Sequence, residues 1–237
     1  GAVKATTTTL TGTGTATFAE DVTGTVAFGA AATASVAAQK KIVGAVTTSA
    51  DGQGTLTFAT ATASNTLASG NIGASGAALL ALNLDSGTTA GTTISLGGDI
   101  FARTVTIANT QTTAFGGDIT AATKVNITGD GTVNIAANKK IVGALDADGN
   151  KGTVQFAATT TDTVLVSGTT GASNAIKVIN VSPATGVTAT FTGAVVATNL
   201  NTGGVGTVAL TSTMGGNLNF GADGTITAGG AVTGNVD

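Results

Sequence analysis

Oxygen-bearing side chains alternate with small residues at Asp146, Asp148 and Asn150. Carboxylate and amide oxygens at positions i, i+2 and i+4 of a loop can converge on Ca²⁺. An EF-hand would next require Gly and, at its end, an acidic ligand, but Lys151 and Ala157 occupy those positions. Asp-Gly and Gly-Asn also form tight turns. We therefore expect a turn between two strands here, with calcium binding by residues 146, 148 and 150 as the alternative.

The sequence offers little for catalysis. It contains no His and no Cys, which removes the commonest general base, the thiol nucleophile and the usual zinc ligands. Glu20 and Asp21 are adjacent carboxylates, and paired carboxylates can cleave polysaccharides. Such enzymes usually grip sugar rings with Trp or Tyr, and both are absent. We expect no enzymatic activity, no catalytic residue, no cofactor and no metal, and keep polysaccharide processing as the weakest alternative.

Charge is sparse and scattered, which limits the possible partners. Nine basic and twelve acidic residues give a net charge of -3. The pairs Lys40–Lys41 and Lys139–Lys140 are too small to follow a phosphate backbone, so we expect no nucleic-acid binding. The longest apolar stretch, residues 77–84, is far shorter than a membrane helix, so we expect no membrane insertion.

The composition favours an all-β fold. Threonine makes up about one residue in five, and Thr and Val suit the pleated surface of a strand. Apolar residues alternate with Thr, Ala or Asn over many short segments, such as Val105/Ile107 and Val125/Ile127. Thirty-six Gly and a single Pro indicate turns made by glycines.

Internal repeats indicate how these strands are arranged. Lys-Lys-Ile-Val-Gly-Ala occurs at Lys40 and again at Lys139, an offset of 99 residues, and each copy leads into a strand that ends in Phe-Ala. Repeats lie near residues 24–59, 125–157 and 216–236. Gly-Gly-Asp-Ile recurs after 19 residues, at 97–100 and 116–119. This spacing is typical of one coil of a β-solenoid. We therefore predict a β-solenoid, with one or two β-sandwich domains as the alternative.

The predicted organisation has two parts. Residues 18–237 form the repetitive β domain, and residues 1–17 form an N-terminal strand. This strand is nearly free of charge and precedes the first recognisable repeat. It could begin the domain, or it could be donated to the sheet of a neighbouring subunit.

Three stretches carry a family resemblance: GTVNIAANKKIVGAL (131–145), GTLTFA (54–59) and LNFGADGTI (218–226). They resemble the passenger repeats of rickettsial outer membrane protein B, an autotransporter surface antigen. The similar stretches cover residues 24–59, 130–157 and 216–236, about a third of the chain. The resemblance implies a β-solenoid passenger in a surface layer that also contributes to adhesion. The sequence shows no translocator barrel, so a passenger fragment and a separate subunit both remain open.

Together these features predict a structural protein that assembles with copies of itself. With 9% charged residues and a single Pro, the strands have little that would block pairing at their edges. We expect an extracellular location at a bacterial cell surface, in a surface layer or a filament. The alternative is an adhesin passenger that binds a host or neighbouring cell surface, for which Phe101 beside Arg103 is the main candidate cluster.

Overall fold

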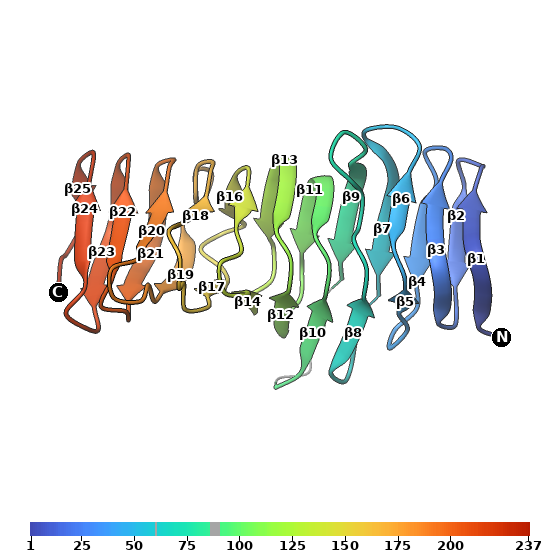
Figure 1. Cartoon of the computed structure of the whole chain (residues 1–237), viewed down its shortest axis with the longest axis horizontal. Coiled ribbons are helices and arrows are strands. Elements are labelled where there is room, and N and C mark those ends of the chain that lie inside the picture. The colour runs from blue at the N-terminus through green and yellow to red at the C-terminus, as the bar shows by residue number, and fades with distance from the viewer. Residues whose placement is uncertain (60, 86–90) are drawn as a thin grey trace.

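The computed structural model of the chain is an all-β, parallel β-solenoid of about 11 turns (Figure 1). It describes residues 1–59, 61–85 and 91–237. Hydrogen bonds join the strands into one 13-stranded and one 12-stranded sheet, and neighbouring strands in both are parallel. The solenoid prediction is therefore confirmed. The sandwich alternative is wrong, because sandwiches pair consecutive strands antiparallel, whereas here each strand pairs with one a full coil away.

Short strands follow one another along the whole rod, separated by turns. Their bounds are β1 Val3–Leu10, β2 Thr15–Phe18, β3 Val22–Phe28, β4 Thr33–Val36, β5 Ile42–Val43, β6 Val46–Thr48, β7 Gln53–Phe58, β8 Asn65–Ala68, β9 Leu79–Leu84, β10 Thr93–Leu96, β11 Ile100–Ile107, β12 Thr112–Phe115, β13 Ile119–Ile127, β14 Thr132–Ile135, β15 Ile141–Val142, β16 Leu145–Ala147, β17 Thr153–Phe156, β18 Thr163–Val166, β19 Ile176–Val181, β20 Thr188–Phe191, β21 Val195–Thr202, β22 Thr207–Leu210, β23 Met214–Phe220, β24 Thr225–Ala228 and β25 Val232–Thr233.

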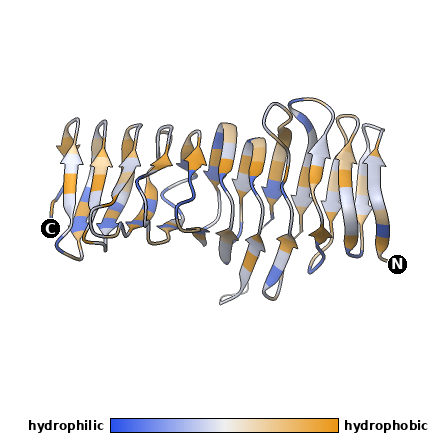
Figure 2. Ribbon diagram, in the orientation of Figure 1, coloured by the Kyte–Doolittle hydropathy of each residue, from blue (hydrophilic) through white to orange (hydrophobic). Residues whose placement is uncertain are grey.

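The core consists of inward-facing apolar columns that run along the rod. Parallel pairing in register places an apolar residue of each coil directly above that of the previous coil, so the hydrophobic positions coloured orange in Figure 2 recur coil after coil. Burial of these side chains is the main source of stability. One such column, buried throughout, contains Val22, Ile42, Ala68, Leu96, Phe115, Ile135 and Phe156.

Two glycines show why only certain residue types fit where the long strands bend. Gly24 in β3 and Gly216 in β23 have φ angles of 114° and 109°, in the region that favours glycine. A Cβ atom on Gly216 would overlap the carbonyl oxygen of Ala197 in the preceding coil, and one on Gly24 would overlap that of Ala5. Register shifts occur beside both positions, so the long strands bend there while pairing continues.

The order of strands repeats every ten elements. β1, β11 and β21 each contain eight residues and a register shift. They are followed in the same order by β2, β12 and β22 and then by β3, β13 and β23. The repeats expected at 24–59, 125–157 and 216–236 are parts of this longer unit, which covers almost the entire chain. Successive copies alternate between the sheets, since β1 and β21 lie in the 13-stranded sheet and β11 in the 12-stranded sheet. A given sequence motif therefore faces more than one side of the rod.

The N-terminal segment forms the first coil of the solenoid. β1 pairs with β3, and β2 pairs with β4, in the same parallel register as the later coils. In the described chain, residues 3–18 thus belong structurally to the repetitive domain. Donation of residues 1–17 to a neighbouring subunit remains a prediction.

Candidate interaction surface

Two outward rows of side chains occupy equivalent places in successive copies of the ten-strand unit. The first, here called the mixed ladder, contains Ser35, Thr57, Asn83, Thr106 and Asn126. The second, here called the amide ladder, contains Asn134, Gln155, Asn180, Asn201 and Asn219. Their members pair in register on adjacent strands, so each row advances by the spacing between strands, about 4.8 Å.

The amide ladder is joined by side-chain hydrogen bonds from coil to coil. Asn180 Nδ2 donates to Gln155 Oε1 at 3.0 Å, and Asn201 Nδ2 donates to Asn180 Oδ1 at 2.8 Å. Asn219 Nδ2 continues the row by donating to Asn201 Oδ1 at 2.8 Å. Stacked amides of this kind reinforce parallel, in-register strands. An amide has two N–H groups and two carbonyl lone pairs, so each side chain keeps hydrogen-bonding capacity for other partners.

The mixed ladder has the same backbone register but fewer contacts along the row. Asn83 Nδ2 donates to Thr57 Oγ1 at 3.4 Å, a long hydrogen bond. Asn126 Nδ2 contacts Asp148 Oδ1 at 3.4 Å, outside the row. The fold therefore fixes where these side chains lie, whereas their residue types decide whether they interact with one another.

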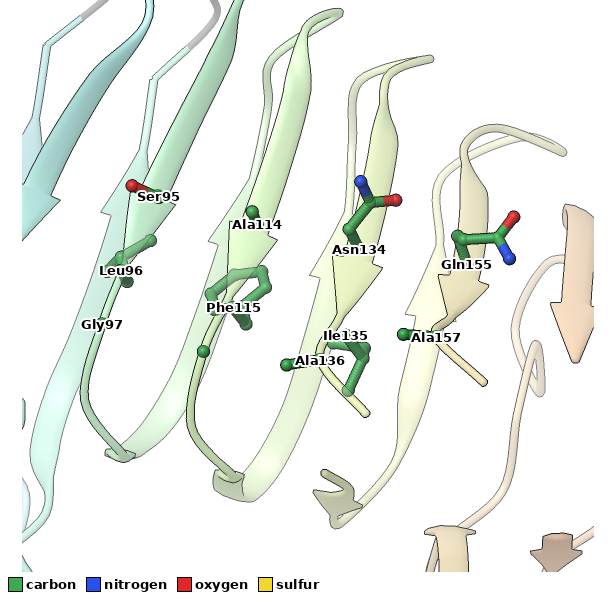
Figure 3. Close-up of a pocket in the computed structure, with 11 residues that line it drawn as sticks. Ser95, Leu96, Gly97, Ala114, Phe115, Asn134, Ile135, Ala136, Gln155 and Ala157 are labelled. Atoms are coloured by element: carbon green, nitrogen blue, oxygen red, sulfur yellow. The ribbon is translucent and has the colours of Figure 1, made fainter. Parts of the chain in front are cut away.

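A shallow trough lies at the N-terminal end of the amide-ladder row. It encloses about 530 Å³ over four coils. Figure 3 shows Ser95, Ala114, Asn134 and Gln155 following one another on successive strands beside it. Ala114 leaves the space that longer side chains fill elsewhere in the row. The remaining lining residues are Leu96, Gly97, Phe115, Gly116, Ile135, Ala136 and Ala157.

The surface around the C-terminal half of the amide ladder is neutral. Residues 178–222, from β19 into β23, contain no Asp, Glu, Lys or Arg. The four ion pairs among the described residues lie elsewhere and are Lys40–Glu20, Arg103–Asp51, Lys124–Asp146 and Lys177–Asp130. The rod thus combines a charged N-terminal and central part with a neutral part faced by amides and hydroxyls.

The three candidate calcium ligands each contact other protein groups. Asp146 is buried and accepts hydrogen bonds from backbone N–H groups, including that of Ser173 at 3.2 Å. Burial raises the pKa of Asp146, but these hydrogen bonds and Lys124 outweigh it and hold the pKa below its usual value. Asp148 contacts Asn126, and Asn150 accepts a hydrogen bond from Thr198 Oγ1 at 2.6 Å. Each side chain therefore has its own protein partner, which favours the turn.

The other charged candidates also have structural partners. Lys40 Nζ lies 2.6 Å from Glu20 Oε2 in the preceding coil, and this contact lowers the pKa of Glu20. The adjacent Asp21 accepts a hydrogen bond from the backbone N–H of Lys41 at 3.2 Å. The two carboxylates thus hold neighbouring coils together. Within the described ranges, no group of three or more acidic residues is placed to hold a metal ion.

In the predicted adhesive cluster, Arg103 likewise has a partner within the protein. Arg103 Nη2 lies 2.9 Å from Asp51 Oδ2, and its hydrogen bond lowers the pKa of that carboxyl. Phe101, two residues before it in β11, is half-buried. The structure thus places the two residues on one strand, with the guanidinium already paired across two coils.

Comparison of the chain with protein-family models, with curated proteins and with solved structures gives no match. The resemblance to the rickettsial surface antigen therefore remains a prediction. Among the residues whose placement is described, no helix is long and apolar enough to cross a membrane.

Proposed function

We propose that this chain is a structural protein of a bacterial cell surface that assembles with copies of itself into a coat or filament. Contacts between exposed strand edges would join the copies, without a cofactor. The alternative function is adhesion, for which the pairing of Arg103 with Asp51 leaves little support at the predicted cluster.

One observation carries the proposal: the outermost strands are open and almost uncharged. β1 and β2 each have a partner on one side only, as do β24 and β25 at the other end of the rod. Lys4 is the one charged residue in these four strands. Unpaired backbone N–H and C=O groups along such an edge can pair with another chain, and lysines are among the devices that normally prevent it.

A second feature supports a scaffolding role over an enzymatic one. The inward columns make a predominantly apolar interior, and the outward rows are small, neutral side chains at regular spacing. Identical contacts can then recur from copy to copy, as a coat or filament requires.

The test places lysines on the open edge. Thr7 and Thr9 in β1 have exposed side chains, so Thr7→Lys with Thr9→Lys adds two charges where a partner strand would pair. The matched control is Thr25→Lys with Ala27→Lys, at the paired positions of β3, one coil inside the edge. Electron microscopy should show assemblies for the unmodified chain and the control, and single rods for the edge variant. Single rods for the unmodified chain, or unchanged assembly of the edge variant, would refute the proposal.

A further inference from the structure

We propose that the amide ladder and the trough form a side-by-side contact between two copies of this chain, lying antiparallel about a twofold axis. This inference rests on the proposed function and names a second surface and its partner. The trough and the amide ladder belong to one outward row, since Ser95 pairs with Ala114, and Ala114 with Asn134, which begins the ladder.

The row is self-complementary when a second copy is reversed against it. One end is hollow at Ala114, and the other presents the amides of Asn180, Asn201 and Asn219. An antiparallel copy places the amide end of each chain over the hollow end of the other. Each contact then occurs twice, which is the defining property of a twofold interface.

Because the row has the same spacing in both copies, the contact repeats along the rod. Both copies advance by the same distance between strands, about 4.8 Å, so alignment at one coil aligns the following coils. With the axis between the coils of Gln155 and Asn180, Asn180 faces Gln155, Asn201 faces Asn134 and Asn219 faces Ala114. The small residues of the trough make room for the partner's side chains.

The chemistry of the row fits a neutral partner. Asn180 and Asn201 are half-buried and each uses one N–H and one carbonyl contact within the ladder. Their remaining groups can bond to the side-chain amides of Gln155 and Asn134 at the trough of a second copy. Because residues 178–222 carry no charge, two copies can approach there without repulsion between like charges.

The first experiment compares two variants with the same added charge. Asn180→Asp with Asn201→Asp places carboxylates in the proposed contact, whereas Asn83→Asp with Thr106→Asp places them at the equivalent positions of the mixed ladder. Sedimentation velocity should show that the first variant weakens pairing by about tenfold or more, and that the second leaves it unchanged. Equal behaviour of the two variants would overturn the proposal.

A third variant distinguishes loss of the contact from loss of the fold. Ala114→Arg fills the trough from an outward position and leaves the hydrogen bonds of the ladder intact. It should also abolish side-by-side pairing while its circular dichroism and melting temperature stay unchanged. Pairing retained by a folded Ala114→Arg chain would overturn the proposal.

The second experiment reads the orientation directly. The chain has no cysteine, so single cysteines report contacts without interference. In a mixture of Asn134→Cys and Asn201→Cys chains, oxidation should join one variant to the other. Disulfides that form preferentially between identical Asn201→Cys chains indicate a parallel arrangement and would overturn the proposal.

Electron microscopy separates this inference from the proposed function. Filaments of single width in the Asn180→Asp, Asn201→Asp variant, with paired filaments in the unmodified chain, support both. Filaments of equal width in the two proteins refute the side-by-side contact alone. Absence of any end-to-end assembly in the unmodified chain refutes the proposed function, whatever happens to the pairs.

Discussion

The mixed ladder and the amide ladder show how one backbone can present two different surfaces. They occupy equivalent strands, such as β9 and β19 or β11 and β21, and have the same parallel register. The amide ladder contains three side-chain hydrogen bonds of 2.8 to 3.0 Å between coils, whereas the mixed ladder has one of 3.4 Å. Coil stacking therefore comes from the shared core, and the properties of each face come from a few outward residues.

The largest expected effect tests the claim that the core is the same under both ladders. Leu82 and Leu200 are both fully buried, beside Asn83 and Asn201 respectively. Leu82→Ala and Leu200→Ala should each lower the free energy of unfolding by about 2–5 kcal/mol, because each leaves a cavity in a packed column. Urea unfolding followed by circular dichroism measures both. A neutral result for either would show that the two halves are not stabilised alike.

The second-largest effect concerns the buried carboxylate of Asp146, which the first copy of the ten-strand unit lacks. Asp146 occupies the place of Thr47 in the first copy and accepts backbone hydrogen bonds from Ala147, Ser173 and Asn174. Asp146→Ala should lower stability by about 1–3 kcal/mol, because these N–H groups lose their acceptor. Thr47→Ala should change it by less than about 0.5 kcal/mol. Similar melting temperatures for the two variants would contradict this role of Asp146.

A smaller effect is expected from the ladders themselves. Asn201→Ala removes one donated and one accepted hydrogen bond and should cost about 1–2 kcal/mol. Thr106, its equivalent, makes no side-chain hydrogen bond within the described part of the mixed ladder, so Thr106→Ala should cost less than about 0.5 kcal/mol. Thermal unfolding of the two variants tests the difference, and equal shifts would mean that the amide contacts contribute nothing.

The smallest effect is a dependence on pH confined to the charged part of the rod. The hydrogen bond from Lys177, together with that from the Gly152 N–H, lowers the pKa of Asp130 from its usual 3.8. A lowered pKa in the folded state stabilises the protein above the unfolded value, and this contribution is lost as the pH falls through the folded value. The pair is half exposed, so the effect should be under about 1 kcal/mol.

Hydrogen exchange at pH 7 and pH 3, corrected for intrinsic rates, locates this dependence. Protection should fall around residues 124–151 and stay constant in residues 195–222, which contain no titratable side chain. A uniform loss of protection along the rod would contradict the contrast between the two regions.

Much of the fold could be predicted from local patterns. The recurrence of Gly-Gly-Asp-Ile after 19 residues predicted one coil, and Ile100 does pair with Ile119 in the structure. The Lys-Lys-Ile-Val-Gly-Ala repeat likewise marked equivalent strands, β5 and β15. These signals survive in sequence because buried positions and corner glycines tolerate few alternatives.

The interaction surface could not be predicted in the same way. Members of the amide ladder lie 18 to 25 residues apart in sequence, and coils of unequal length hide their alignment. Asp146 in β16 shows the same limit, because spacing alone cannot reveal that Ser173 and Asn174 in the next coil supply its partners. Contacts between coils depend on register, which only the assembled solenoid defines.

Sedimentation velocity of the 237-residue chain over a wide range of concentrations tests the central claim of self-assembly most directly. Since open, neutral edges and rows favour association, the weight-average sedimentation coefficient should rise steadily with concentration. A single coefficient for one elongated monomer, constant up to the highest concentration, would contradict it.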